Sequence, residues 1–157
     1  MEKKILSSVV IAGLLLWGVT GTVFAGVEPS PFQPQISTLH SIGLTMAVSQ
    51  KFLDGLVVAQ TLPRGTKVDL LATQYGLQTI DTLLAGILSK LPPSYDEQVF
   101  FALEGIRMVA LGMEDPLDYI LWRMGIEPSP WNVILDSIAS RISDYVRASC
   151  PVGASCP

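Results

Sequence analysis

Prolines divide the chain beyond residue 35 into segments, and within each segment apolar residues recur at every third or fourth position. Between Ile36 and Leu62, for example, there is no proline, and the apolar residues follow one side of a helix. This period is typical of an amphipathic α-helix, whereas a half-buried strand alternates with a period of two. No segment shows that alternation, so we expect an all-α fold.

Proline, glycine and capping residues mark the ends of five expected helices. These helices span residues 36–62, 66–90, 94–112, 115–124 and 130–148. Ser94 and Glu97 form a capping box for the third helix, and Asp115-Pro116 is a start signal for the short fourth one. Because short loops favour antiparallel neighbours, we expect a compact antiparallel bundle of about five helices, four long and one short.

The expected helix 94–112 differs from the others because apolar side chains surround almost its whole circumference. They are Phe100, Phe101, Leu103, Ile106, Met108, Val109 and Leu111. A helix that is apolar on all sides is normally contacted on several sides, so we expect this one at the centre of the core. The last helix, in contrast, separates an apolar from a polar side most clearly.

The first 25 residues have the composition of a secretory signal peptide. Lys3 and Lys4 precede an apolar run, and the segment ends in the small-x-small pattern of Val23 and Ala25. The run of about 15 apolar residues is shorter than the roughly 20 of a membrane-spanning helix, so an uncleaved anchor is the weaker alternative. We expect cleavage after Ala25 and a periplasmic or secreted protein.

Cleavage would leave a proline-rich extended lead-in at 26–35, one helical domain at 36–148 and a Cys/Pro tail at 149–157. The leader holds one acidic and two basic residues, so 13 of the 14 acidic and 8 of the 10 basic residues remain. This mildly acidic chain lacks the clustered positive charge that binds nucleic acid. Charged residues also interrupt each later apolar stretch, so we expect no membrane span in the mature chain.

Small residues recur on one side of two expected helices. They are Ala72, Gly76, Thr79 and Gly86 in helix 66–90, and Ala102, Gly105 and Gly112 in helix 94–112. Glycine inside a helix costs roughly 1 kcal/mol relative to alanine, so we expect a use for the missing side chain. Close approach of the two helix backbones is the simpler interpretation. A groove for a small apolar ligand is the alternative.

Three aromatic residues cluster around the short expected helix and the proline-marked turn after it, namely Tyr119, Trp122 and Trp131. Tyrosine and tryptophan are enriched at interfaces because they bury a large area and keep a polar tip. Core packing is the simpler interpretation of the three. A patch for a protein or envelope partner is the alternative.

Cys150 and Cys156 are the two cysteines of the chain. In an oxidising compartment two cysteines this close usually pair, so we expect a disulfide within the tail. A cross-link to another chain is the alternative. The spacing matches neither a Cys-x-x-Cys redox motif nor a four-ligand zinc site, and we expect no metal.

No sequence pattern indicates catalysis or a cofactor. His40 is the single histidine, and there is no Gly-x-Ser-x-Gly turn or phosphate-binding loop. Asp81 and the pair Glu104 and Arg107 lie within apolar helices, where structural ion pairing is simpler than a catalytic role. The sequence therefore favours an exported, non-enzymatic helical interaction protein of the cell envelope. A carrier or sensor of a small apolar ligand, held between the glycine-bearing helices, is the alternative.

Overall fold

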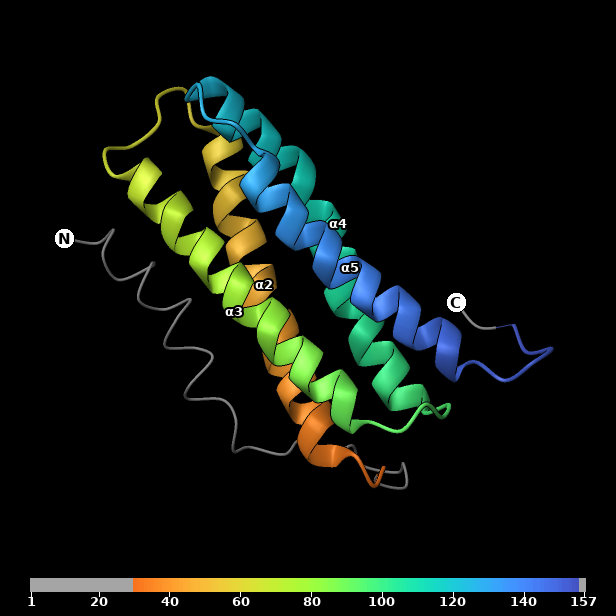
Figure 1. Cartoon of the computed structure of the whole chain (residues 1–157). Helices are drawn as coiled ribbons and strands as arrows, with labels where there is room; N and C mark the ends of the chain where they lie inside the picture. The colour runs from red at the N-terminus through yellow and green to blue at the C-terminus, as the bar shows by residue number, and fades with distance from the viewer. Residues whose placement is uncertain (1–29, 156–157) are drawn as a thin grey trace.

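The computed structural model describes residues 30–155, which form four α-helices (Figure 1). The helices are α2 (Gln33–Val58), α3 (Thr66–Lys90), α4 (Glu97–Arg123) and α5 (Ser129–Ser149). No strand occurs in this part of the chain, so the all-α prediction is confirmed. The expected signal peptide at 1–25 lies outside the described residues.

The four helices run alternately up and down the long axis of the bundle (Figure 1). The most extensive packing joins α2 to α4, followed by α4 to α5 and α5 to α3, while α2 and α3 touch sparsely. Between residues 30 and 155, no Cα atom of α3 lies within 8 Å of one of α4, although the two helices are consecutive. They therefore occupy opposite corners of the bundle, and the parallel pair α2 and α4 lies side by side.

One continuous helix, α4, takes the place of two expected helices, those at 94–112 and 115–124. Pro116 lies inside α4, where its missing N–H removes a backbone hydrogen bond and costs about 3 kcal/mol. Met113 and Leu117, on either side of it, are fully buried. Because packing of such side chains outweighs the local cost, the described residues hold four helices rather than five.

The starts of two helices also differ from the expected ones. α2 begins at Gln33, within the expected lead-in, because Pro34 lies in the first turn, where no N–H partner is needed. α4 begins at Glu97, and Asp96 rather than the expected Ser94 provides the cap. The Asp96 carboxylate accepts hydrogen bonds from the second and third backbone N–H groups of the helix, at 3.0 and 3.1 Å.

Aliphatic side chains from all four helices fill the core. Those without any exposed surface include Leu39, Ile42, Met46, Leu53, Leu70, Leu84, Leu103, Ile106, Leu117, Leu121, Leu135, Ile138 and Ile142. Each fully buried side chain of this kind contributes about 1.5–3 kcal/mol relative to an exposed one. Burial of this core is the main favourable contribution to the stability of the bundle. None of the helices described is long and apolar enough to cross a membrane.

The position of α4 corrects the expectation of a central helix. α4 occupies one corner, between α2 and α5, and only its inward side is buried, with Leu103 and Ile106 among the core residues. Phe101, Met108 and Leu111 point outward and are exposed. A bundle of four helices has no central member, so every helix keeps one side in solvent, including a helix that is apolar all round.

Candidate functional site

The outward side of α4 carries five large apolar side chains, which we call the α4 apolar face. The exposed fractions are 77% for Phe101, 64% for Met108, 43% for Leu111, 44% for Tyr119 and 74% for Trp122. Their spacing in steps of seven, three, eight and three residues places them on one side of the helix. The face is therefore a stripe along most of α4, interrupted by the exposed Asp115 between Leu111 and Tyr119.

The size of this stripe is that of the largest apolar patches on typical monomeric proteins, which are often functional. Its ends, Phe101 and Trp122, are roughly 30 Å apart at about 1.5 Å per residue. Aromatic side chains bury roughly 150–250 Å² each, so the exposed fractions of the three aromatics amount to roughly 300–500 Å². Monomeric proteins rarely expose contiguous apolar patches beyond a few hundred Å², and larger patches mark interaction sites.

The C-terminal end of the stripe is held in place by Arg123. Tyr119 and Trp122 have ring centroids 6.3 Å apart, and the Arg123 guanidinium lies 5.7 Å from the centre of the Tyr119 ring. The same guanidinium donates hydrogen bonds from Nη1 to the Ala59 carbonyl (3.0 Å) and from Nη2 to the Gln60 carbonyl (3.1 Å), just beyond α2. A partner would meet a preorganised surface, which lowers the entropic cost of binding.

Trp131 does not belong to this surface. It is 3% exposed, and its indole Nε1 donates a hydrogen bond to the Leu70 carbonyl on α3 (3.0 Å). Of the three aromatics that the sequence grouped, the structure brings Tyr119 and Trp122 together and places Trp131 in the core. The start of α5 brings Trp131 inward, against α3.

The small residues of α3 and α4 do not face one another, because the two helices lie at opposite corners. Gly76 and Ala102 are buried, Thr79 is half-buried, and Gly86 is exposed on α3. Neither the close approach of these two backbones nor a ligand groove between them is formed in the described part of the chain.

The two α4 glycines instead lie beside the α4 apolar face. Gly105 is exposed, and a Cβ atom placed there would have no neighbour within 4 Å. Gly112 is also exposed, but the amide nitrogen of Gln50, from α2, would lie 2.6 Å from such a Cβ. Gly105 thus leaves an open depression on α4, whereas Gly112 gives room to a side chain of α2.

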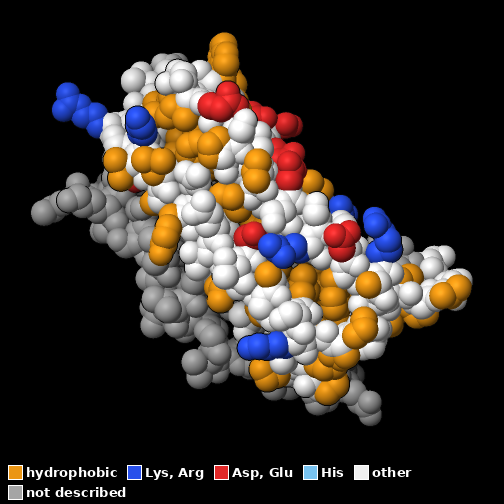
Figure 2. All heavy atoms as spheres, viewed as in Figure 1, with side chains coloured by type: hydrophobic (Ala, Val, Ile, Leu, Met, Phe, Trp, Pro, Cys, Tyr) orange, Lys and Arg blue, Asp and Glu red, His pale blue; other side chains and the backbone are white. Residues whose placement is uncertain are grey.

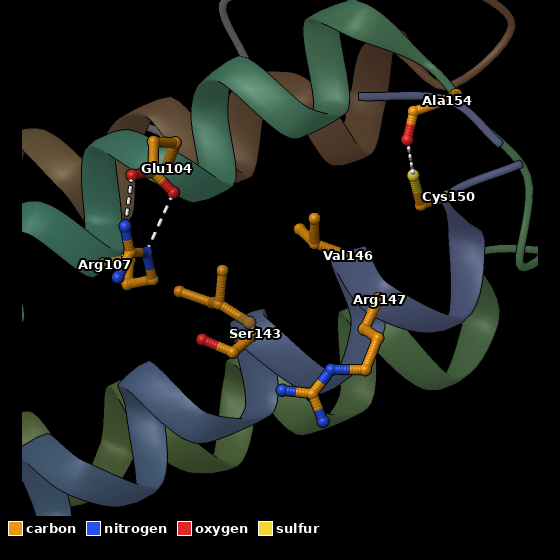
Figure 3. A pocket seen from close by; sticks show the side chains of 8 residues that line it. Glu104, Arg107, Ser143, Val146, Arg147, Cys150 and Ala154 are labelled. Atoms are coloured by element: carbon orange, nitrogen blue, oxygen red, sulfur yellow. Dashed lines mark hydrogen bonds and ion pairs between the residues drawn. The ribbon is translucent and has the colours of Figure 1, made fainter. Parts of the chain in front are cut away.

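A cleft of about 490 Å³ lies between α4 and α5 near the start of the tail (Figure 3). Its lining residues are Glu104, Arg107, Ile142, Ser143, Val146, Arg147, Cys150 and Ala154. Figure 3 shows Glu104 and Arg107 on α4 across from Ser143 and Val146 on α5. Because Glu104 lies three residues from Phe101 and four from Met108, and Arg107 lies four from Leu111, the cleft borders the α4 apolar face.

The charged groups in the cleft are paired. Arg107 Nε donates to Glu104 Oε2 (2.9 Å), and its Nη2 donates to Oε1. These hydrogen bonds lower the pKa of Glu104 and raise that of Arg107, in each case against the opposing effect of partial burial. Arg147 is 3.8 Å from Asp144. The rim is therefore close to neutral and carries no unpaired charge that would select an ion.

One end of the cleft is closed by the tail, where the Cys150 sulfur lies 3.6 Å from the Ala154 carbonyl oxygen. Cys156 lies outside the described residues, so the disulfide stays a prediction. If it forms, it would fix this wall of the cleft.

Acidic side chains gather farther along α4 and α5, and Figure 2 shows them along one edge of the molecule. Burial, followed by the nearby carboxylates of Asp136, Asp118 and Asp115, raises the pKa of Glu114. Between residues 30 and 155 no group of three or more histidine, cysteine or acidic side chains is placed to hold a metal ion. The neighbouring carboxylates of Glu114, Asp115, Asp118 and Asp136 give this edge a concentrated negative charge.

The remaining polar candidates are engaged in the fold. Asp81 on α3 accepts hydrogen bonds from Ser137 Oγ (3.0 Å) and Arg141 Nε (2.9 Å), both on α5. His40 is half-buried on α2. None of these residues converges with another on a cleft.

Comparisons with protein families, curated proteins and solved structures give no match for this chain. The site therefore has to be interpreted from its own geometry. Phe101 and Met108, its most exposed members besides Trp122, were not among the residues that the sequence singled out for binding. Their helical spacing predicts burial in a central helix, whereas the structure exposes both side chains.

Proposed function

We propose that this chain is an exported, non-enzymatic interaction protein that binds a protein partner through the α4 apolar face. The observation that carries the proposal is the exposure of Phe101, Met108 and Trp122 on one side of one rigid helix. Aromatic residues and methionine are the types enriched at protein interfaces, and tryptophan and tyrosine dominate their energetic hot spots.

The surroundings of this face favour a protein over a nucleic acid or an anionic membrane. Both of those alternatives require clustered lysine and arginine, whereas here Asp115 lies within the face and Glu114 and Asp118 flank it on α4. A stripe about 30 Å long also suits a partner helix, which presents apolar residues with the same spacing.

A carrier of a small apolar ligand has less support. The glycine-bearing helices α3 and α4 are not apposed, and the cleft between α4 and α5 has charged groups at its rim. A carrier site normally encloses its ligand within mostly apolar walls.

Export is part of the proposal and is supported by the composition of residues 1–25. The mass of the protein recovered outside the cytoplasm tests it. A mass that begins at Gly26 is expected, and a full-length mass would contradict cleavage after Ala25.

Photocrosslinking tests the interaction surface. p-Benzoylphenylalanine replaces Trp122 in one variant and Val133 in a control variant, since Val133 is a 66% exposed apolar residue on the solvent side of α5. In the native exported fraction we expect a defined adduct from position 122 and none from position 133. Absence of an adduct at 122, or equal adducts at both positions, would refute the proposed surface.

A further inference from the structure

We infer that the partner of the α4 apolar face is a second copy of this chain, with the two α4 helices packed antiparallel about a two-fold axis. This inference rests on the proposed function, because it names the occupant of the same surface. It follows from the spacing, the sizes and the charges of the residues on that side of α4.

The spacing on the outward side of α4 is that of a coiled-coil seam. Positions 101, 105, 108, 112, 115, 119 and 122 follow one another in alternating steps of four and three. A repeat of this kind averages 3.5 residues and keeps one side of a helix against a neighbouring helix over its whole length. The inward side of α4 already packs on α2 and α5, so the seam is available to a helix outside the monomer.

The sizes along this seam are self-complementary. In an antiparallel pair, one register places Phe101 opposite Gly112 of the second copy and Met108 opposite Gly105. The symmetry repeats both contacts in the other direction, so Met108 meets the open position at Gly105, while Phe101 packs over Gly112, where the Gln50 side chain of α2 fills the space. The open space around Gly105 is the depression that such a knob requires. If the partner were a different protein, nothing would require the large and the small residues of this chain to match one another.

The same register extends the contact beyond the four central positions. It brings Trp122 to the turn before α4 of the second copy, where Pro92 and Pro93 are exposed. A stable interface needs about 800 Å² from each partner, and the three aromatics of the α4 apolar face supply roughly half of it. Met108, Leu111 and this turn are available for the remainder.

The charges favour the antiparallel over the parallel arrangement. Parallel α4 helices would place the acidic group around Glu114 and Asp115 beside its own copy. In the antiparallel register the two Asp115 positions are roughly 25 Å apart along the axis, at about 1.5 Å per residue. This separation exceeds the Debye length of about 8 Å at physiological ionic strength, so the repulsion is screened.

An exchange of knob and hole tests the register. Gly105→Met alone sets methionine against methionine, and Met108→Gly alone sets glycine against glycine. The double variant Gly105→Met, Met108→Gly restores one large and one small residue at each contact. By sedimentation equilibrium we expect each single variant to weaken the dimer by about tenfold or more, and the double variant to recover most of the loss. Circular dichroism of every variant checks that the monomer remains folded.

A wild-type protein that stays monomeric at 100 µM, or a double variant weaker than both single ones, would overturn the dimer. p-Benzoylphenylalanine in place of Phe101 separates this failure from that of the proposed function. An adduct of twice the chain mass supports the dimer. An adduct with a different protein overturns the dimer but retains the partner-binding surface. No adduct with either contradicts both.

Discussion

The solvent sides of α4 and α5 differ sharply, although the two helices are neighbours in the same bundle. The solvent side of α5 carries Asp136, Ser140, Arg141, Asp144 and Arg147, whereas that of α4 carries aromatic and aliphatic residues. Both helices bury a full inward stripe, so this fold requires apolar residues on only one side of an edge helix. The outward apolar residues of α4 are therefore not required by the packing of the monomer.

The largest effect is expected when the two sides of α4 are compared directly. Leu103→Ala removes a fully buried side chain and should lower the free energy of unfolding by about 2–5 kcal/mol. Phe101→Ala, two residues away, should change it by no more than about 0.5 kcal/mol. Urea unfolding followed by circular dichroism, at a concentration below dimer formation, measures both. Similar costs for the two variants would mean that Phe101 is part of the core.

The two tryptophans of the helical domain give a smaller contrast. Trp131→Phe removes the hydrogen bond to the Leu70 carbonyl inside the core and should cost about 1–3 kcal/mol. Trp122→Phe should stay within about 0.5 kcal/mol, since its side chain is mostly exposed. Urea midpoints and m-values compare the two. A Trp131→Phe variant as stable as Trp122→Phe would contradict the division into core and surface aromatics.

The smallest effect concerns the acidic edge and depends on pH. Because the pKa of Glu114 is raised in the folded protein, protonated Glu114 favours the folded state. That stabilisation is fully present below the unfolded pKa and is lost as the pH rises through the folded one. Glu114→Gln should therefore raise the melting temperature slightly at pH 7, and leave it unchanged below pH 4. For this partly exposed group, the gain in the free energy of unfolding should be less than about 1 kcal/mol.

Asp144→Asn, at an exposed acidic residue of α5, is the matched control for Glu114→Gln. It should leave the difference in melting temperature between pH 4 and pH 7 close to that of the wild type. If Glu114→Gln lowers the melting temperature at pH 7, ionised Glu114 does not destabilise the folded state, and the prediction is wrong.

The helical character of the chain follows directly from its sequence, because the period of the apolar residues depends on local geometry alone. The same period did not show whether a residue such as Phe101 or Met108 points to the core or to solvent. An all-round apolar helix is compatible with either position, and only the arrangement of the other helices decides. The prediction of five helices is wrong because Pro116 was interpreted as a helix start. Its local cost inside α4 is offset by burial of Met113 and Leu117.

The candidate site was predictable only in part, because the arrangement of the helices decides which of its residues are exposed. Tyr119 and Trp122 were recognised as an interface candidate, but Trp131 was grouped with them because it is near in sequence. Short loops suggested that consecutive helices are neighbours, and on that basis Gly76 and Gly105 would have lined one groove. The diagonal position of α3 relative to α4 depends on long-range packing, which no local pattern reports.

The side-by-side packing of α2 and α4 also has a consequence for how the chain folds. Its polar contacts join residues 63 to 66 positions apart, among them Ser30 to Asp96 and Arg123 to Gln60. Folding rates fall as the mean sequence separation of contacts rises, so this bundle should fold more slowly than one built from consecutive hairpins. Until α4 has been synthesised, α2 lacks its main packing surface. A nascent chain would stay unfolded for longer, which is the state in which secretion machinery threads a polypeptide across a membrane.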